Sequence, residues 1–131
     1  MSDVGSWEPD VPALSDVHRM ILGVAIKSLD QPNLGLSLEQ QDSIRQAVHA
    51  SAESWMDFAQ DQSSSVVVNW IRALTRAEMV LSGFELGARS PVIALIRLLK
   101  RRGEYPDELT GWVKVNTDNR FLPYGSLLDR L

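Results

Sequence analysis

The chain has 131 residues, a net charge of −4 and no cysteine. This length suffices for one domain with its own core, and the apolar share of 44% and charged share of 23% are those of an ordinary globular protein, which excludes a disordered chain and a coiled-coil rod. The missing cysteines exclude disulfides, thiolate metal sites and cysteine nucleophiles.

Residues 1–14 show no periodicity and hold Pro9 and Pro12, so we predict an extended amino-terminal arm. The first ten residues carry acids where a secretory signal needs a basic start and an apolar run. The longest apolar run, Val92–Ile96, is far shorter than the about 20 residues of a membrane span. These patterns predict a cytoplasmic protein with no membrane contact.

The first helix is expected to begin at Ser15 or Asp16, because either side chain can accept a hydrogen bond from the first turn. The helix is predicted to end at about Leu29. Apolar residues lie on most of its faces, which predicts that neighbouring helices surround it. The segment 30–35 contains proline, asparagine and glycine and therefore ends the helix.

A second helix is predicted from Ser37 to about Ala59. Ser37 and Gln40 have the spacing of a capping box, in which each side chain binds the other residue's backbone amide. An apolar stripe at helical spacing follows: Ile44, Val48, Ser51, Ala52, Trp55, Phe58 and Ala59.

The third predicted helix covers residues 66–84, because apolar side chains recur there every three or four residues. The valine triplet 66–68 is typical of a strand, but it is too short to decide against this longer period. The stripe is interpreted as core, with the alternative that two protomers share it in a homo-oligomer: Val67, Trp70, Leu74, Ala77, Leu81 and Phe84.

The fourth helix is expected over residues 91–102 and is the most apolar of the chain. Ser90 supplies the cap, and Pro91 occupies the first helical position, where its missing amide costs nothing. The helix should end at Gly103, which can adopt the left-handed conformation.

A shorter fifth helix is predicted from Pro106 to about Val115, followed by a loop at 116–125 and a final turn at 126–131. The predicted fold class is therefore all-α. We expect one domain over 15–131, an irregular bundle of about five helices with the third and fourth at its centre.

Catalytic and metal-binding patterns are weak. His49, Glu53 and Asp57 are four residues apart, which would place them on one ridge of the second helix, but a solvated ridge explains them without a metal. His18 is expected at the surface, because a protonated ring is unfavourable at a helix start. No nucleophile motif is present, and no pattern selects a cofactor or a metal.

An enzyme built on carboxylates is one alternative function. Glu78 and Glu85 are seven residues apart and share a helix face. The observation that would favour this alternative is a cleft that holds a carboxylate with a strongly raised pKa.

A small nucleic-acid-binding regulator is another alternative, based on the basic segment Arg97–Arg102. Residues 1–65 hold three basic against ten acidic residues, which gives −7, whereas residues 66–131 hold ten against seven, which gives +3. Basic residues also belong at the end of a helix, which explains the same segment without a ligand. Strong salt dependence of affinity would identify nucleic-acid binding.

The leading hypothesis is a non-enzymatic protein-interaction or regulatory module that binds a protein partner through the loop 116–125 and nearby basic residues. Aromatic and hydrogen-bonding side chains on a loop are typical of recognition surfaces. The competing interpretation is that Phe121, Leu122 and Tyr124 fold back and cover the open end of the bundle. The candidate binding residues are Arg101, Arg102, Trp112, Asn119, Arg120, Phe121 and Tyr124.

Overall fold

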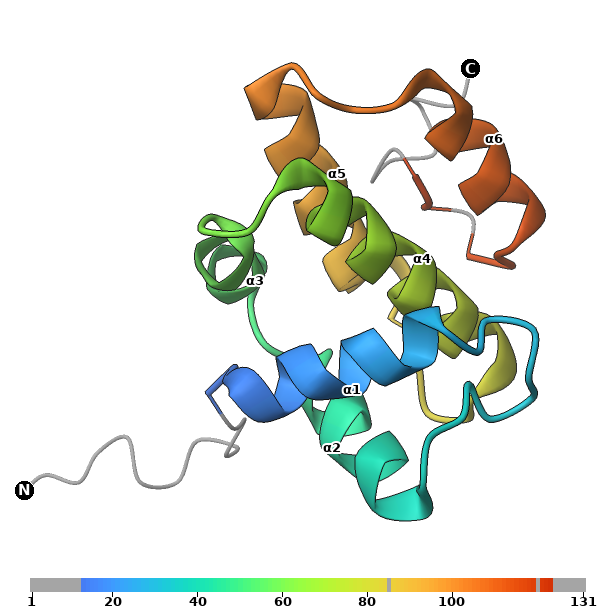
Figure 1. Ribbon diagram of the computed structural model, residues 1–131. Helices are drawn as coiled ribbons and strands as arrows, with labels where there is room; N and C mark the ends of the chain where they lie inside the picture. Colours follow the sequence, from blue (N-terminus) through green and yellow to red (C-terminus); the bar gives the residue numbers. More distant parts are fainter. Residues whose placement is uncertain (1–12, 85, 120, 124–131) are drawn as a thin grey trace, which may run out of the picture.

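The computed structural model describes residues 13–84, 86–119 and 121–123, and this part of the chain is all-helical (Figure 1). The predicted arm and the predicted final turn lie almost entirely outside these residues. The helices are α1 (Asp16–Ile26), α2 (Leu38–Ala47), α3 (Ala52–Ala59), α4 (Ser64–Val80), α5 (Pro91–Arg102) and α6 (Asp107–Val115), with a short 3₁₀ turn, η2 (Gly87–Arg89), before α5.

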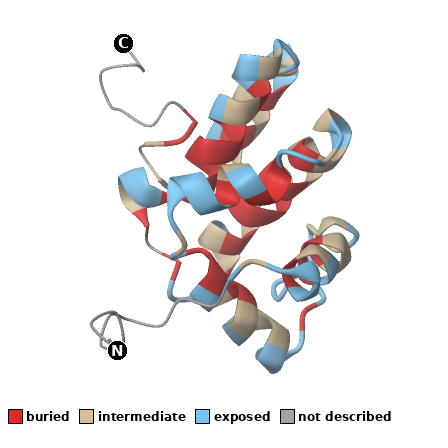
Figure 2. Cartoon of the chain, turned by 90° about the vertical axis from the view of Figure 1, so that its left-hand side faces the viewer, coloured by how far each residue is buried: buried red, intermediate tan, exposed pale blue. Residues whose placement is uncertain are grey.

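Helices α4 and α5 pack against each other, and each also contacts a further helix. α5 packs on α3, α4 packs on α1, and α1 packs on α2. In Figure 2 the buried positions run along the facing sides of the helices, and exposed positions cover their outer sides. The largest side chains with almost no exposed surface include Trp55, Phe84, Ile71, Leu95 and Leu109, so one core joins all these elements.

The predicted start of α2 and both predicted ends of α5 are confirmed. The Ser37 hydroxyl accepts a hydrogen bond from the Gln40 amide (3.1 Å), and Gln40 Oε1 accepts one from the Ser37 amide (3.0 Å). The Ser90 hydroxyl caps α5 by accepting from the Val92 amide (3.2 Å). Gly103 has a φ of 71°, the left-handed conformation expected after the last turn.

The prediction of one continuous helix over 37–59 is wrong, because the chain breaks at 48–51. α2 ends at Ala47, and Ser51 starts a new helix by accepting a hydrogen bond from the Ser54 amide (3.1 Å). The carbonyl of Ala47 accepts two hydrogen bonds at the break, from the Ala50 amide (3.0 Å) and from the indole of Trp55 (3.1 Å). The break therefore buries Trp55 completely and places Ser51 at the surface instead of in the predicted stripe.

We expect Ser51→Ala to lower the free energy of unfolding by about 1 kcal/mol, because it removes the side-chain acceptor at the start of α3. Ser51→Asp should keep most of the stability, since aspartate also caps. The control is Ser43→Ala, inside α2, where alanine is the better helix former. Urea unfolding checks the set; equal stability of Ser51→Ala and wild type would show that the cap does not hold this break.

The prediction that His18 is a surface residue is also wrong: its exposed fraction is 4%. Ser15 precedes α1 as predicted, and its backbone amide donates to Nδ1 of His18 (3.0 Å). The ring thus occupies the position that glutamate or glutamine takes in a capping box. This requires an unprotonated Nδ1, and burial lowers the pKa of His18, so the neutral ring is the favoured form.

Three further helix boundaries differ from the prediction. α1 ends at Ile26, earlier than Leu29, and α4 spans Ser64–Val80, so it begins and ends before the predicted 66–84. Ser63 caps α4 from the serine-rich connection, accepting from the Val66 amide (3.3 Å). The stripe that offered a dimer alternative is buried within the single chain, with exposed fractions of 0–9%: Val67, Trp70, Leu74, Ala77, Leu81 and Phe84.

The break at 48–51 also removes the helical ridge proposed for His49, Glu53 and Asp57, because His49 precedes α3 while the two acids lie on it. Among the described residues no group of three or more histidines and acids is placed to hold a metal ion. None of the helices within that part of the chain combines the length and apolar character needed to cross a bilayer.

Candidate functional site

A cavity of about 410 Å³ lies where the end of α4, the segment before η2 and the loop after α6 meet. We call it the loop pocket. Apolar side chains form most of its wall, and four polar side chains join them. Its described lining residues are Glu78, Phe84, Leu86, Gly87, Thr117, Asp118, Asn119 and Phe121.

Glu78 connects three elements of the pocket. Its Oε2 accepts a hydrogen bond from the hydroxyl of Ser90, the residue that caps α5, and its Oε1 accepts one from Nδ2 of Asn119 (3.2 Å). Ser90 is itself buried, with 3% of its surface exposed. One carboxyl group thus links α4, the start of α5 and the loop after α6.

Burial raises the pKa of Glu78 to about 7, and the hydrogen bonds from Ser90 and Asn119 act in the opposite direction by stabilising the carboxylate. Desolvation is the larger effect, because the charged form loses water that two hydrogen bonds only partly replace. The carboxyl is therefore divided between its neutral and ionised forms near neutral pH, where small changes in its surroundings shift its charge.

Asn119 fixes the shape of the loop. Its Nδ2 also donates to the carbonyl of Gly87 (2.9 Å), and its Oδ1 accepts from the amide of Phe121 (2.9 Å). The Asn119 amide donates to the hydroxyl of Thr117 (3.0 Å). These local bonds turn the chain so that half-buried Phe121 becomes a wall of the pocket.

The loop also covers part of the core, as the competing interpretation expected for Leu122. Leu122 has no exposed surface, and Pro123 is buried as well. Gly87, which faces the ring of Phe121, has a φ of 58°, a conformation that favours glycine. The described part of the loop therefore does both things: Leu122 and Pro123 complete the core, while Asn119 and Phe121 line a cavity.

The basic residues predicted to surround the loop lie elsewhere. Arg101 and Arg102 are at the carboxyl end of α5, whereas Ser90 and the loop pocket are at its start. Twelve helical residues separate the two ends by about 18 Å. The structure thus joins Asn119 and Phe121 with Glu78 rather than with the basic cluster.

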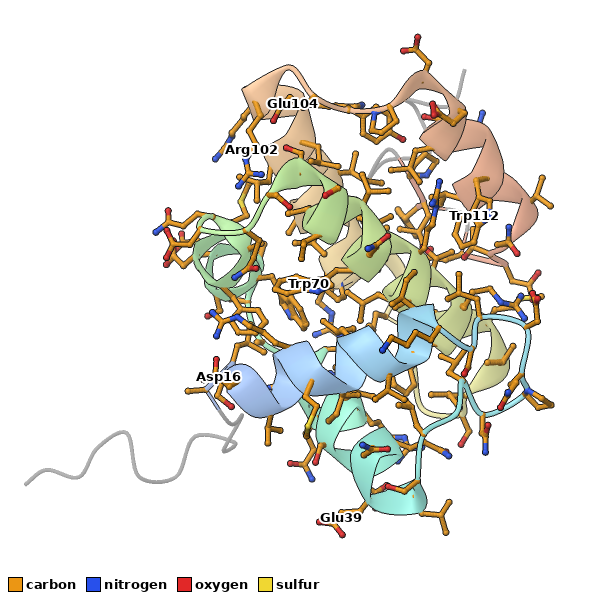
Figure 3. The ribbon with its side chains drawn as sticks, viewed as in Figure 1. Asp16, Glu39, Trp70, Arg102, Glu104 and Trp112 are labelled. Atoms are coloured by element: carbon orange, nitrogen blue, oxygen red, sulfur yellow. The ribbon has the colours of Figure 1, made fainter. Side chains whose placement is uncertain are left out.

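Arg102 is engaged in the fold. Its guanidinium donates to the carbonyls of Ala59 (3.3 Å) and Gln60 (2.9 Å) at the end of α3 and to the hydroxyl of Ser64 (3.1 Å) at the start of α4. The Ser64 hydroxyl in turn donates to Glu104. Figure 3 shows Arg102 and Glu104 together at the end of α5, so this arginine fastens three helices together.

The remaining predicted site residues either lie away from the loop pocket or fall outside the described residues. Trp112 is half-buried on α6 (Figure 3), away from the pocket lining. The guanidinium of Arg72 lies 5.7 Å from the centre of its ring. Arg101 is exposed. Arg120, Tyr124 and Glu85 lie outside the described residues.

Sequence reasoning found Glu78 only as half of a pair with Glu85, and it missed the connection to Ser90 and Asn119. Ser90 was identified as a helix cap and Asn119 as a loop residue, but their shared partner lies 12 and 41 residues away along the chain. No local pattern carries that information.

No known protein family, curated protein or solved structure matches this chain. The function is therefore argued from the chemistry of the site alone.

Proposed function

We propose that this chain is a non-enzymatic protein-interaction module that binds its partner through the loop pocket and receives there a lysine or arginine side chain of the partner. The observation that carries the proposal is an ionisable carboxyl, Glu78, set in a cavity with mostly apolar walls. The loop after α6, which the sequence marked as a recognition surface, supplies one side of that cavity.

The dimensions and lining suit a long basic side chain. Lysine and arginine carry a methylene stem that packs on apolar surface and a charged head that needs an acceptor. Phe84, Leu86 and Phe121 offer the surface for the stem, and Glu78 and exposed Asp118 offer carboxylates for the head. The volume, about 410 Å³, lies in the range of ordinary ligand pockets.

Glu78 retains acceptor capacity for such a head group. A carboxylate has about four acceptor positions, and Ser90 and Asn119 use two of them. A cation at the free positions would lower the pKa of Glu78 by stabilising its charge. Binding and ionisation are then linked, so the affinity should rise with pH up to about pH 8.

The test is a titration followed by the backbone amide signals in nuclear magnetic resonance, with N-acetyl-lysine amide and N-acetyl-arginine amide as probes. We expect a Kd on the order of millimolar, with shifts around Glu78, Leu86, Asn119 and Phe121. N-acetyl-norleucine amide, which keeps the stem without the charge, should bind several-fold more weakly. Affinity for the lysine probe should fall about tenfold from about pH 8 to about pH 6, because protonation removes the carboxylate.

Two variants decide whether the pocket is responsible. Glu78→Gln should abolish the preference for lysine over norleucine, whereas Glu39→Gln, at an exposed acid on α2, should preserve it. Equal binding of lysine and norleucine by the wild type, or equal losses in both variants, would contradict the proposal. The partner itself can then be captured from native extract with wild type and Glu78→Gln compared after nuclease treatment.

The second candidate is an enzyme in which Glu78 acts as a general acid or base. The raised pKa within a cavity is the observation that favours it, since acid–base catalysis works best when the pKa lies near the working pH. Both oxygens of Glu78, however, bond to Ser90 and Asn119, which gives the residue a structural task. Two results together would favour the enzyme. The wild type would turn over a neutral substrate that Glu78→Gln does not, and the wild type would bind the lysine probe no better than the norleucine probe.

A further inference from the structure

A second cavity, of about 280 Å³, lies on the other side of the segment that precedes α5, between that segment and the turn joining α2 to α3. We call it the basic pocket. Leu86 lines both cavities, and Ser90, which lines the basic pocket, holds Glu78 of the loop pocket. The described lining of the basic pocket is Val48, His49, Ala50, Ser51, Ala52, Leu86, Ala88, Arg89, Ser90, Ile93, Ala94 and Arg97.

The charges of the basic pocket are of one sign. Arg89 and Arg97 line it, His49 adds a ring that can donate a hydrogen bond, and no acid is among its described lining residues. Neither arginine forms an ion pair or side-chain hydrogen bond within the described part of the chain, although the whole chain is acidic. Arg102 and Arg45 show the contrast, because carbonyl oxygens bind both of them.

Buried apolar side chains also line the basic pocket, and we call them its apolar floor. Ile93, Ala94 and Val48 have at most 4% of their surface exposed and contribute to the cavity lining. Arg97 stands on the exposed side of α5 beside Ile93 and Ala94, and Arg89 comes from η2 at the start of that helix. The pocket is thus lined both by two exposed arginines and by buried apolar residues.

We infer that the basic pocket binds an anionic ligand, a carboxylate or a phosphate monoester, whose compact apolar body rests on Ile93 and Ala94. Guanidinium groups bind both kinds of anion through paired N–H donors. The apolar floor excludes a bare inorganic ion as the best ligand, because such an ion leaves this surface uncovered. This site is separate from the loop pocket and takes the opposite charge.

The inference is tested by isothermal titration and amide shifts with four probes: benzoate, phenyl phosphate, inorganic phosphate and neutral benzyl alcohol. We expect benzoate or phenyl phosphate to bind about tenfold more tightly than inorganic phosphate and benzyl alcohol, since only these two use both the arginines and the floor. Shifts should centre on residues 48–52 and 86–97. Whichever of the two binds more tightly identifies the anion as carboxylate or phosphate.

The variants Arg89→Gln and Arg97→Gln should each weaken the better probe about tenfold. Arg101→Gln is the matched control, because Arg101 is exposed one turn later on the same helix and does not line the pocket. Equal losses at Arg97 and Arg101, or no preference for the probes with an apolar body, would overturn the inference. Glu39→Gln, at an exposed acid on α2, should leave this binding unchanged. The anionic probes report on the basic pocket and the lysine probe reports on the loop pocket, so failure of one proposal is distinguishable from failure of the other.

Discussion

Glu78→Gln is expected to raise the stability of the domain at about pH 8 and to leave it nearly unchanged at about pH 5. Folding moves the pKa of Glu78 from 4.5 to about 7, so the folded chain holds this proton more tightly than the unfolded chain. The neutral carboxyl therefore contributes stability below about pH 4.5 that is lost as the pH rises through about 7. Glutamine keeps a neutral group at this position at every pH.

The size of the effect follows from the shift. A pKa that rises by about 2.5 units corresponds to roughly 2.5 kcal/mol of stability lost by the wild type between about pH 5 and about pH 8. Glutamine can accept from Asn119 through its oxygen and donate to the Ser90 hydroxyl through its nitrogen, so the contacts of the neutral acid are retained.

His18 acts in the opposite direction and must be separated from Glu78. Its pKa is lowered by burial, so the neutral ring stabilises the fold above about pH 6.5 and this contribution is lost as the pH falls. Both proteins carry His18, and its contribution cancels in the difference between Glu78→Gln and wild type. That difference, rather than either curve alone, reports on Glu78.

Urea unfolding at a series of pH values from about 5 to 8 measures the difference. Glu39→Gln is the control, because Glu39 is exposed on α2 and points away from the body of the protein (Figure 3). Its difference from wild type should vary little with pH. A Glu78→Gln difference that stays constant over the same range would mean that the carboxyl is not desolvated in the folded chain.

Local rules predicted the helical class and several helix ends, because capping depends on neighbours in sequence. Ser15, Ser37, Ser90 and Gly103 all stand where the pattern placed them. The same rules failed at Ser51, where the apolar period predicts a continuous helix but the serine side chain can also cap a new one. The helical spacing of apolar residues continues across 48–51, but Ser51 caps a new helix there and buried Trp55 bonds to the last residue of α2.

The candidate site was predictable only in part. Asn119 and Phe121 were found because a loop with hydrogen-bonding and aromatic side chains is unusual after a helix. The carboxyl that shares their cavity belongs to α4, and Arg89 and Arg97 line a second cavity together with His49 from the turn after α2. Such meetings depend on how helices pack, which the period of a single helix does not specify.

Arg102→Ala is expected to lower the free energy of unfolding by about 2 kcal/mol, although the sequence placed Arg102 among the binding residues. The substitution removes three donated hydrogen bonds; the carbonyl of Gln60 loses this partner, whereas the carbonyl of Ala59 still accepts from the Gln62 amide (2.9 Å). The positive charge of the guanidinium also interacts favourably with the negative carboxyl end of the α3 dipole, where these carbonyls lie. Arg102→Lys should lose part of this stability, because a single ammonium cannot reproduce the planar fork.

Arg101→Ala is the matched control, because Arg101 precedes Arg102 on α5 but is exposed. Its removal should change stability by less than about 0.5 kcal/mol. Thermal or urea unfolding of Arg102→Ala and Arg101→Ala, measured side by side, distinguishes a structural role from a binding role for the basic residues at the end of α5. If Arg102→Ala were as stable as Arg101→Ala and lost a bound partner instead, Arg102 would be a recognition residue and the end of α5 would be a second contact surface. Loss of stability at Arg102 alone would leave partner binding to the pockets at the opposite end of α5.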